Sequence, residues 1–124
     1  MKKELRIKKS DEIELVMKKG YSKANRTFIV YKLKNSDQTG YRVALSAPKK
    51  IGKAVIRNKV KRQMRAILGQ NPHILTNGFD YFIIARPDIL DIDFITATKQ
   101  MIHVMKLVHQ TAPNKHPKKP IKKS

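Results

Sequence analysis

The residues of this chain that could do chemistry are chiefly cations, and they are concentrated in one segment, Lys49–Arg65. The basic residues of this segment are Lys49, Lys50, Lys53, Arg57, Lys59, Lys61, Arg62 and Arg65. No carboxylate occurs anywhere between Asp37 and Asp80. A solvent-exposed helix is normally supported by Glu–Lys pairs one turn apart and weakened by like charges. The pattern therefore predicts a surface that a polyanion neutralises, and we interpret that polyanion as RNA.

From Gly52 onward the same segment has the spacing of an amphipathic helix. Its apolar residues recur at i, i+4, i+8 and i+11, which places them on one side of a helix. These residues are Ile56, Val60, Met64 and Ile67. The residues expected beside this stripe are Arg57, Lys61 and Arg65, with Asn58 and Arg62 further round. The helix is thus predicted to dock on a core with one side, to present cations on the other, and to end at Gly69.

Charge alone leaves other interpretations of this helix open. The cations could form a solvated face with no dedicated ligand. A continuous basic helix could also enter the major groove of DNA. The major groove of A-form RNA is too deep and narrow for that entry, so an RNA partner would be met through phosphates, hydroxyls and folded shape.

No arrangement of side chains suited to catalysis is recognisable in the sequence. The nearest carboxylate groups, Asp91 with Asp93 and the cluster at residues 11–14, fall where helix caps and first turns belong. The four histidines lack metal-ligand spacing, there is no cysteine, and no glycine-rich phosphate loop occurs. We therefore predict no catalytic residue and no metal ligand, since a nuclease would need a metal cluster or a general base.

Length and composition describe a small and strongly basic chain. Its 124 residues include 28 basic and 9 acidic ones, which gives a formal net charge of +19. This length is enough for one domain with a modest core. No apolar run approaches the roughly 18 residues of a membrane span, and the N-terminus lacks the apolar segment of a signal peptide. The expectation is a cytoplasmic protein with no membrane partner.

Four elements are expected before the basic helix. The first is an extended basic arm, and the second is a helix that Ser10 or Asp11 caps and Gly20 ends. Two runs rich in β-branched and aromatic residues follow, and we expect them to pair as a hairpin across a polar turn. In order, these elements are residues 1–9, 10–19, 27–33 and 41–47.

Three further segments are expected from the basic helix onward. Phe79–Ala85 is mostly apolar and indicates a buried strand, so the strand, helix and strand predict a parallel crossover. Asp91 or Asp93 is expected to cap a last helix that ends at His109. Residues 111–124 contain three prolines and five lysines, which predicts a disordered basic tail. The chain would thus form one RNA-binding domain, residues 1–110, followed by the tail.

The central motif also resembles that of a known family, the bacterial ribonuclease P protein subunit. The similarity lies in the order and spacing of residues, extends over about residues 1–109, and includes a basic N-terminus ahead of a short helix. The residues that carry it are Lys49-Lys50-Ile51-Gly52-Lys53-Ala54-Val55, Arg57-Asn58-Lys59, Lys61-Arg62 and Arg65, together with Ala24-Asn25-Arg26, Phe28 and Tyr31.

The resemblance implies a particular α/β fold. It is a two-layer sandwich in which a small mixed sheet packs with three helices, as in the second domain of a small-subunit ribosomal protein. Its β-α-β crossover would be left-handed, against the right-handed default. The residue pattern by itself predicts only that the two strands are parallel.

The resemblance also implies a function. In that family an RNA, with its metal ions, cleaves precursor tRNA at the mature 5′ end. The implied partners are the catalytic RNA and the 5′ leader of precursor tRNA, with Mg²⁺ at the RNA active site, no protein-bound cofactor and no DNA. A structural RNA-binding protein of the ribosomal type and a protein-only nuclease are the competing hypotheses. The residues implied to meet RNA are Lys49, Lys50, Lys53, Arg57, Asn58, Lys59, Lys61, Arg62 and Arg65.

A cleft for the single-stranded leader is implied between the first helix, the sheet face and the flank of the basic helix. Its implied residues are Ile13, Met17, Phe28, Tyr31, Ser46, Lys61 and Arg65. An aromatic ring suits this task because every base has a face on which it can stack. The positions that depart from the family's usual pattern are Lys59 in place of arginine, Ile13 and Met17 in place of aromatics, and Pro48 in place of serine. Lys59 cannot make the forked phosphate contact that an arginine makes. Ile13 and Met17 replace aromatic stacking by softer apolar contact.

Overall fold

The computed structural model describes residues 6–37 and 39–110. The predicted basic tail and the first five residues of the predicted arm lie outside this part of the chain. The helices and strands, in chain order, are α1 Ser10–Lys19, β1 Tyr21–Ala24, β2 Phe28–Lys34, β3 Arg42–Ser46, α2 Ala54–Gln70, β4 Phe79–Ala85 and α3 Phe94–His109. Short 3-10 turns are η2 Lys49–Ile51, η3 Pro72–Ile74 and η4 Pro87–Asp91.

The four strands form one mixed sheet in the order β1-β2-β4-β3. The predicted hairpin between β2 and β3 is wrong, because β4 lies between them, antiparallel to β2 and parallel to β3. The parallel β3-α2-β4 crossover is confirmed, whereas its left-handedness stays a prediction. The short strand β1, which was not predicted, pairs with β2 at the sheet edge.

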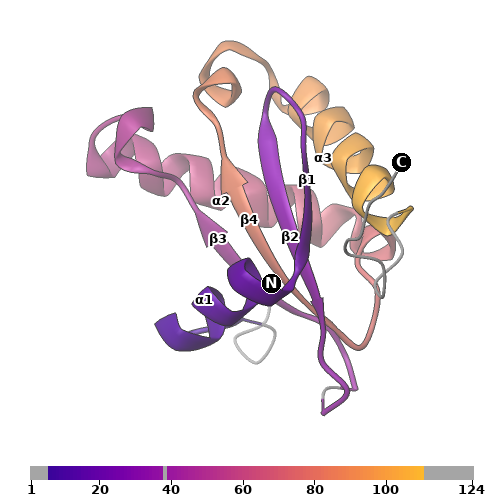
Figure 1. Ribbon diagram of the computed structural model, residues 1–124. Helices are drawn as coiled ribbons and strands as arrows, with labels where there is room; N and C mark the ends of the chain where they lie inside the picture. The colour runs from indigo at the N-terminus through magenta and orange to yellow at the C-terminus, as the bar shows by residue number, and fades with distance from the viewer. Residues whose placement is uncertain (1–5, 38, 111–124) are drawn as a thin grey trace, which may run out of the picture.

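The two faces of the sheet are covered unequally, as Figure 1 shows with α1 in front of the strands and α2 behind them. The main core lies between the sheet and the helices α2 and α3. Fully buried residues of that core include Val30, Tyr81, Met64 and Met101. The opposite face carries only α1, whose Val16 packs with Phe82 in a smaller cluster. Part of this second face therefore stays open.

The side chains of β2 alternate between the two faces of the sheet, as they do in any strand. Phe28, Val30 and Lys32 are buried on the α2 and α3 side, and the residues between them are half-buried on the α1 side. Gly20 ends α1 as predicted, and a Cβ there would lie 2.7 Å from the carbonyl oxygen of Lys32. Glycine is thus required where the end of α1 meets β2.

Several helix boundaries differ from the predictions. The N-cap of α1 is Lys9, with no side-chain hydrogen bond, so Ser10 and Asp11 are helical residues rather than caps. Helix α2 continues through Gly69 because nothing in its backbone requires an end there. Helix α3 begins only after Asp93, whose carboxylate accepts a hydrogen bond from Thr96 N at 2.8 Å. Of the two predicted caps of α3, Asp93 is therefore confirmed.

The part of the predicted N-terminal arm that the structure describes is attached to the sheet. Arg6 forms a parallel bridge with Val43 of β3, and Ile7 N donates to Val43 O at 3.0 Å. Ile7 is only 5% exposed. These residues extend the β3 edge instead of forming a free arm.

Candidate RNA interface

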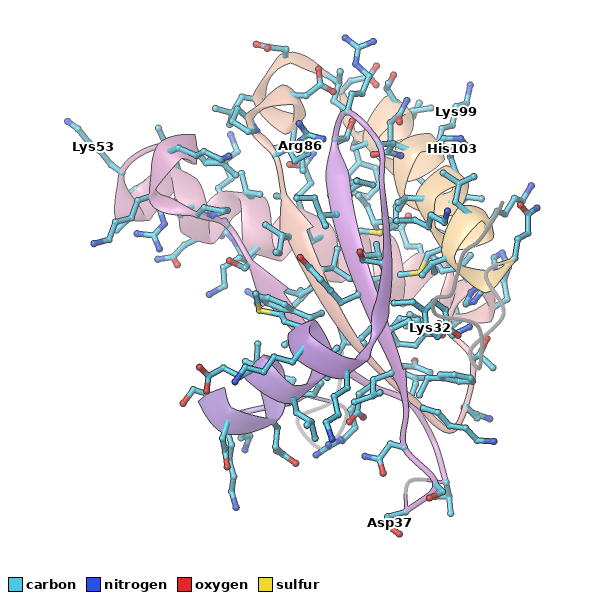
Figure 2. All side chains as sticks on the ribbon, viewed as in Figure 1. Lys32, Asp37, Lys53, Arg86, Lys99 and His103 are labelled. Atoms are coloured by element: carbon cyan, nitrogen blue, oxygen red, sulfur yellow. The ribbon has the colours of Figure 1, made fainter. Side chains whose placement is uncertain are left out.

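The basic segment begins with a turn that only glycine adopts easily. Gly52 has φ of 152°, and a Cβ there would lie 3.3 Å from Cδ1 of Ile56. The turn separates η2 from α2, whose N-cap is Lys53. Lys49, Lys50 and Lys53 are all exposed at this end of the helix, and Figure 2 shows Lys53 projecting away from the rest of the molecule.

Helix α2 docks with the side that the sequence predicted. Val60, Met64 and Ile67 are buried, whereas Ile56, the first residue of the predicted stripe, is 40% exposed. Ile56 lies in the first turn of α2, where the core no longer covers it. The remaining sides of the helix carry cations. We call these cations, those of the preceding turn and the neighbouring Asn58 the basic ridge. Its members are Lys49, Lys50, Lys53, Arg57, Asn58, Lys59, Lys61, Arg62 and Arg65.

The cations of the basic ridge have no carboxylate partners among the described residues. Ion pairs in this part of the chain involve only Arg26 and Arg42 as cations. Lys59 and Arg62 are exposed, and Lys61 and Arg65 are half-buried on the flank of the helix. Such an unneutralised row attracts polyanions over distances of about a Debye length, roughly 8–10 Å at physiological salt.

Arg57 differs from its neighbours because it also has a structural contact. Its Nε donates to the carbonyl oxygen of Ala47 at 2.8 Å, which ties the start of α2 to the end of β3. A guanidinium group has five N–H donors, so four remain for other partners. The loss of Arg57 would therefore affect both the local structure and any bound phosphate.

The open face of the sheet is where the predicted leader cleft lies. Tyr31 stacks beside Phe82 with ring centroids 6.2 Å apart and an interplanar angle of 27°. Ile13 of α1 packs against the same cluster, and Met17 is 42% exposed at its border. Ser46 is half-buried opposite Ile84. The surface is mostly apolar, with one aromatic pair.

A hollow of about 170 Å³ lies between α1, the β3 edge and α2. It brings together three predicted cleft residues, Ile13, Lys61 and Arg65. Arg6 is a further cation on its lining, which the sequence analysis missed by assigning residues 1–9 to a free arm. The sequence does contain a signal for this position of Arg6, because the apolar Ile7 follows it directly and such alternation is typical of a strand. The cleft thus combines an apolar floor with cations from two elements.

Phe28 does not belong to this cleft. It is fully buried on the opposite face of β2, within the core under α2 and α3. Successive side chains of a strand point to opposite faces, so Phe28 and Tyr31 cannot line one surface. Phe82 lies on the same face of the sheet as Tyr31, because period-two alternation in β4 places it there, but it is only 9% exposed and packs beside the Tyr31 ring instead of lining an open surface.

Several carboxylates of the described residues are engaged elsewhere in the fold. Asp80 and Glu12 bind Arg42, and Asp88 accepts from Thr27 Oγ1 at 2.8 Å. Over residues 6–37 and 39–110, no three His, Cys, Asp or Glu side chains gather as a metal site requires. The same ranges contain no helix long and apolar enough to cross a membrane.

A small α/β protein with an unneutralised basic helix beside an apolar, partly aromatic sheet face is a nucleic-acid-binding protein in class. The model of the Ribonuclease P family matches residues 1–109. The Bacillus cereus "Ribonuclease P protein component" is 43% identical over 106 residues, which are 86% of this chain and 92% of that protein. The chain therefore belongs to the ribonuclease P protein family.

Solved structures agree with this assignment. The RNase P protein of Staphylococcus aureus is 38% identical, with a TM-score of 0.76 over 83% of this chain and 94% of that one. The RNase P protein from Thermotoga maritima is 30% identical, with a TM-score of 0.75 over 83% and 96% of the two chains. The three-helix, mixed-sheet α/β fold predicted from the sequence is thereby confirmed, and the contacts of single residues with RNA stay predictions.

Proposed function

We propose that this protein is the RNA-binding partner of a catalytic RNA, and that the two together remove the 5′ leader of precursor tRNA in the cytoplasm. The protein side chains bind and position the RNA, and the RNA cleaves the phosphodiester bond. The observation that carries the proposal is the basic ridge, whose cations have no carboxylate partners in the described residues and lie on α2 and on the turn that leads into it. RNA phosphates supply the missing negative charge.

The leader of precursor tRNA is proposed to bind the open sheet face. Tyr31, with Phe82 packed beside it, offers an aromatic platform for an unpaired base, and Ile13 and Met17 offer apolar contact in place of further rings. Lys61 and Arg65 belong to the basic ridge and also lie beside this face. One strand of RNA could therefore be held by its bases on the sheet face and by its phosphates on the ridge. Contact with unpaired bases distinguishes a precursor from a mature tRNA.

Magnesium is proposed to act on the RNA and not on the protein. When bound, the ion stabilises the charge that develops on the oxygens of the phosphodiester during cleavage. The described carboxylates do not gather as a metal site requires, and three of them are engaged elsewhere: Asp80 with Arg42, Asp88 with Arg26 and Asp93 with the first turn of α3. The protein's contribution is therefore binding and orientation.

Reconstitution tests the proposal most directly. The chain is mixed with precursor tRNA, Mg²⁺ and the cognate catalytic RNA, and the cleavage products are mapped. We expect cleavage at the mature 5′ end only when the catalytic RNA is present. Addition of the chain should allow this cleavage at lower concentrations of precursor tRNA. Cleavage by the chain alone would indicate a protein nuclease. Cleavage by the catalytic RNA that does not change when the chain is added would indicate a structural RNA-binding protein.

The leader cleft has a sharper test at Tyr31. Tyr31→Ala should weaken binding of precursor tRNA by about 1–3 kcal/mol if a base stacks on the ring. Tyr31→Phe is the matched control, because it keeps the ring and should retain most of the affinity. Equilibrium binding of precursor and mature tRNA is compared for each variant. Equal losses for the two RNAs would contradict a leader-specific contact.

A further inference from the structure

One lysine of the sheet is buried where a cation is costly. Lys32 of β2 is only 5% exposed, and Figure 2 shows it beside the C-terminal end of α3. Its partners across the neighbouring strands are Tyr21 and Tyr81. No carboxylate of the described residues forms an ion pair with it. A buried ammonium group without such a partner must be held by other groups.

Those other groups are a histidine and two aromatic rings. Lys32 Nζ lies 2.8 Å from His109 Nδ1. The same nitrogen lies 4.2 Å from the centroid of the Phe79 ring and 6.0 Å from that of Tyr81. Aromatic faces attract cations electrostatically, and the attraction is stronger where water is excluded. The ammonium group is therefore bound through one lone pair and two ring faces.

The hydrogen bonds of His109 assign its tautomer. Nε2 of His109 lies 2.6 Å from the carbonyl oxygen of Ile74 in η3. A carbonyl oxygen only accepts, so Nε2 must carry the hydrogen, and Nδ1 is left with the lone pair that Lys32 requires. His109 is the last residue of α3. This single neutral imidazole thus connects β2, η3 and the end of α3.

We propose that Lys32, His109 and the Ile74 carbonyl group form a pH-sensitive latch, which holds the end of α3 and η3 against the sheet at neutral pH and opens when His109 Nδ1 takes up a proton. A protonated imidazole donates from both nitrogens. Nδ1–H would then face the N–H donors of Lys32 across 2.8 Å, with two like charges and no acceptor between them. The contact must break, because neither group can reverse its role.

The groups around the latch do not offset this repulsion. Tyr81 meets the His109 ring edge-on at 6.2 Å, and burial raises the pKa of Tyr81 and of Tyr21, so both phenols stay neutral. Phe79 is uncharged. On the elements packed against the latch, His73 of η3 and Lys106 of α3 are also titratable, and both are exposed.

The pH range of the latch follows from the direction of the pKa shifts. Burial lowers the pKa of His109 below its ordinary value of about 6.5, and the charge of Lys32 adds to this, against an opposing effect of the bond to Ile74. Burial likewise lowers the pKa of Lys32. A histidine whose pKa is lower in the folded state than in the unfolded state contributes its full stabilisation of the fold at pH values above the unfolded-state pKa. This stabilisation is lost as the pH falls through the folded-state pKa. The latch is therefore closed at neutral pH and opens in acid.

Opening would be local, and two backbone amides report it. Leu75 N donates to Pro72 O at 3.1 Å within η3, and Gln110 N donates to Lys106 O at 3.1 Å in the last turn of α3. The ladder between β2 and β4 does not depend on the latch. Acid should therefore expose these two amides while those of the central strands remain protected.

The test is hydrogen exchange of the whole chain over a series of pH values, combined with ¹⁵N chemical shifts of the His109 ring. We expect the Nε2–H tautomer at pH 7. Between the pKa of His109 in the open state, near the ordinary value of about 6.5, and its lower folded-state pKa, the protection factors of Leu75 and Gln110 should fall by up to about tenfold for each pH unit, since opening takes up one proton. A charged His109 at pH 7, or a ring that titrates with no change in protection, would overturn the proposal.

Variants separate the latch from general acid sensitivity. His109→Gln keeps an N–H group for Ile74 but binds no proton, so the acid dependence of Leu75 and Gln110 should vanish. His103→Gln is the matched control, since it removes an exposed histidine of the same helix, 3.2 Å from Asn25 Nδ2. It should keep the tenfold dependence. Unchanged acid dependence in His109→Gln, or its loss in His103→Gln, would contradict the latch.

A third variant keeps the proposal testable if His109→Gln does not fold. Lys32→Met has a similar stem and no charge, so the His109 ring should titrate at a higher pH than in the parent chain. Protonation of Nδ1 would then meet no opposing ammonium group, and the two reporter amides should lose most of their acid dependence. A His109 titration unchanged by Lys32→Met would overturn the proposal.

Discussion

Two sets of cations in the described part of this protein differ in their partners. Arg42 and Lys32 lie within the fold, and each has specific groups around it. The cations of the basic ridge lie at the surface of α2 and have no carboxylate partner in the described part of the chain. A high net charge therefore does not by itself indicate how many cations can bind a polyanion. Of these two sets, only the second is free to do so.

The two interior cations also differ from each other. Arg42 donates from Nε and Nη2 to the two carboxylate oxygens of Asp80 at 3.0 and 2.9 Å, and from Nη2 to Glu12 at 3.1 Å. The bond to Asp80, above all, raises the pKa of Arg42, so its charge is permanent. Lys32 is held by a neutral histidine instead, so its environment depends on pH. The first site is a fixed structural contact between α1 and the sheet, whereas the second is conditional.

The largest expected effect comes from breaking the Arg42 site. Asp80→Ala should reduce the free energy of unfolding by about 3–5 kcal/mol, because it leaves Arg42 without its buried partner. The side chain of Asp80 is 6% exposed and that of Arg42 17%. Urea unfolding at pH 7 measures the loss.

Glu12→Ala is the matched control for this prediction. The side chain of Glu12 is 36% exposed, and ion pairs that are this open to solvent contribute about 0–1 kcal/mol. The two carboxylates bind the same arginine but differ in burial and in the number of hydrogen bonds that they accept from it. Equal losses for Asp80→Ala and Glu12→Ala would show that burial does not determine the strength of the site.

The sequence predicted well those elements whose pattern has one strong interpretation. Phe79–Ala85 matches β4 residue for residue, because a long apolar run between turn residues is typical of a buried strand. The docking side of α2 followed from helical spacing, with Ile56 as the exception. The acid-free segment indicated the ridge because like charges on one helix are unfavourable without a partner. These signals are local, so a single sequence contains them.

Features that depend on strand order could not be predicted in the same way. Strand β1 has only four residues, three of them exposed, and it is held by pairing with β2 instead of by an apolar pattern of its own. The hairpin between β2 and β3 was the simplest choice for neighbouring strands, but β4 is inserted between them. Strand alternation places Lys32 on the same face as Phe28 and Val30, whereas its partner His109 lies 77 residues away in sequence.

The error at Phe28 had a different origin. The alternation of β2 already placed Phe28 and Tyr31 on opposite faces, so the sequence contained the evidence against a shared cleft. The assignment followed the family motif, in which the two residues are close in sequence. A motif records which residues recur together, and only the strand geometry tells which of them meet a ligand.

The smallest expected effect concerns a single cation of the basic ridge. Arg62→Ala should leave the free energy of unfolding within about 0.5 kcal/mol of the parent value, because Arg62 is exposed and far from the core. If Arg62 binds one phosphate, its removal should weaken RNA binding by about 1 kcal/mol at 0.15 M salt and make the slope of log K against log salt shallower by about 0.7–0.9. Lys106→Ala on α3 removes the same unit of charge away from the ridge and should change neither the slope nor the affinity by as much. Titrations of the catalytic RNA at several salt concentrations measure both quantities, and identical slopes for the two variants would mean that net charge, and not the ridge, determines binding.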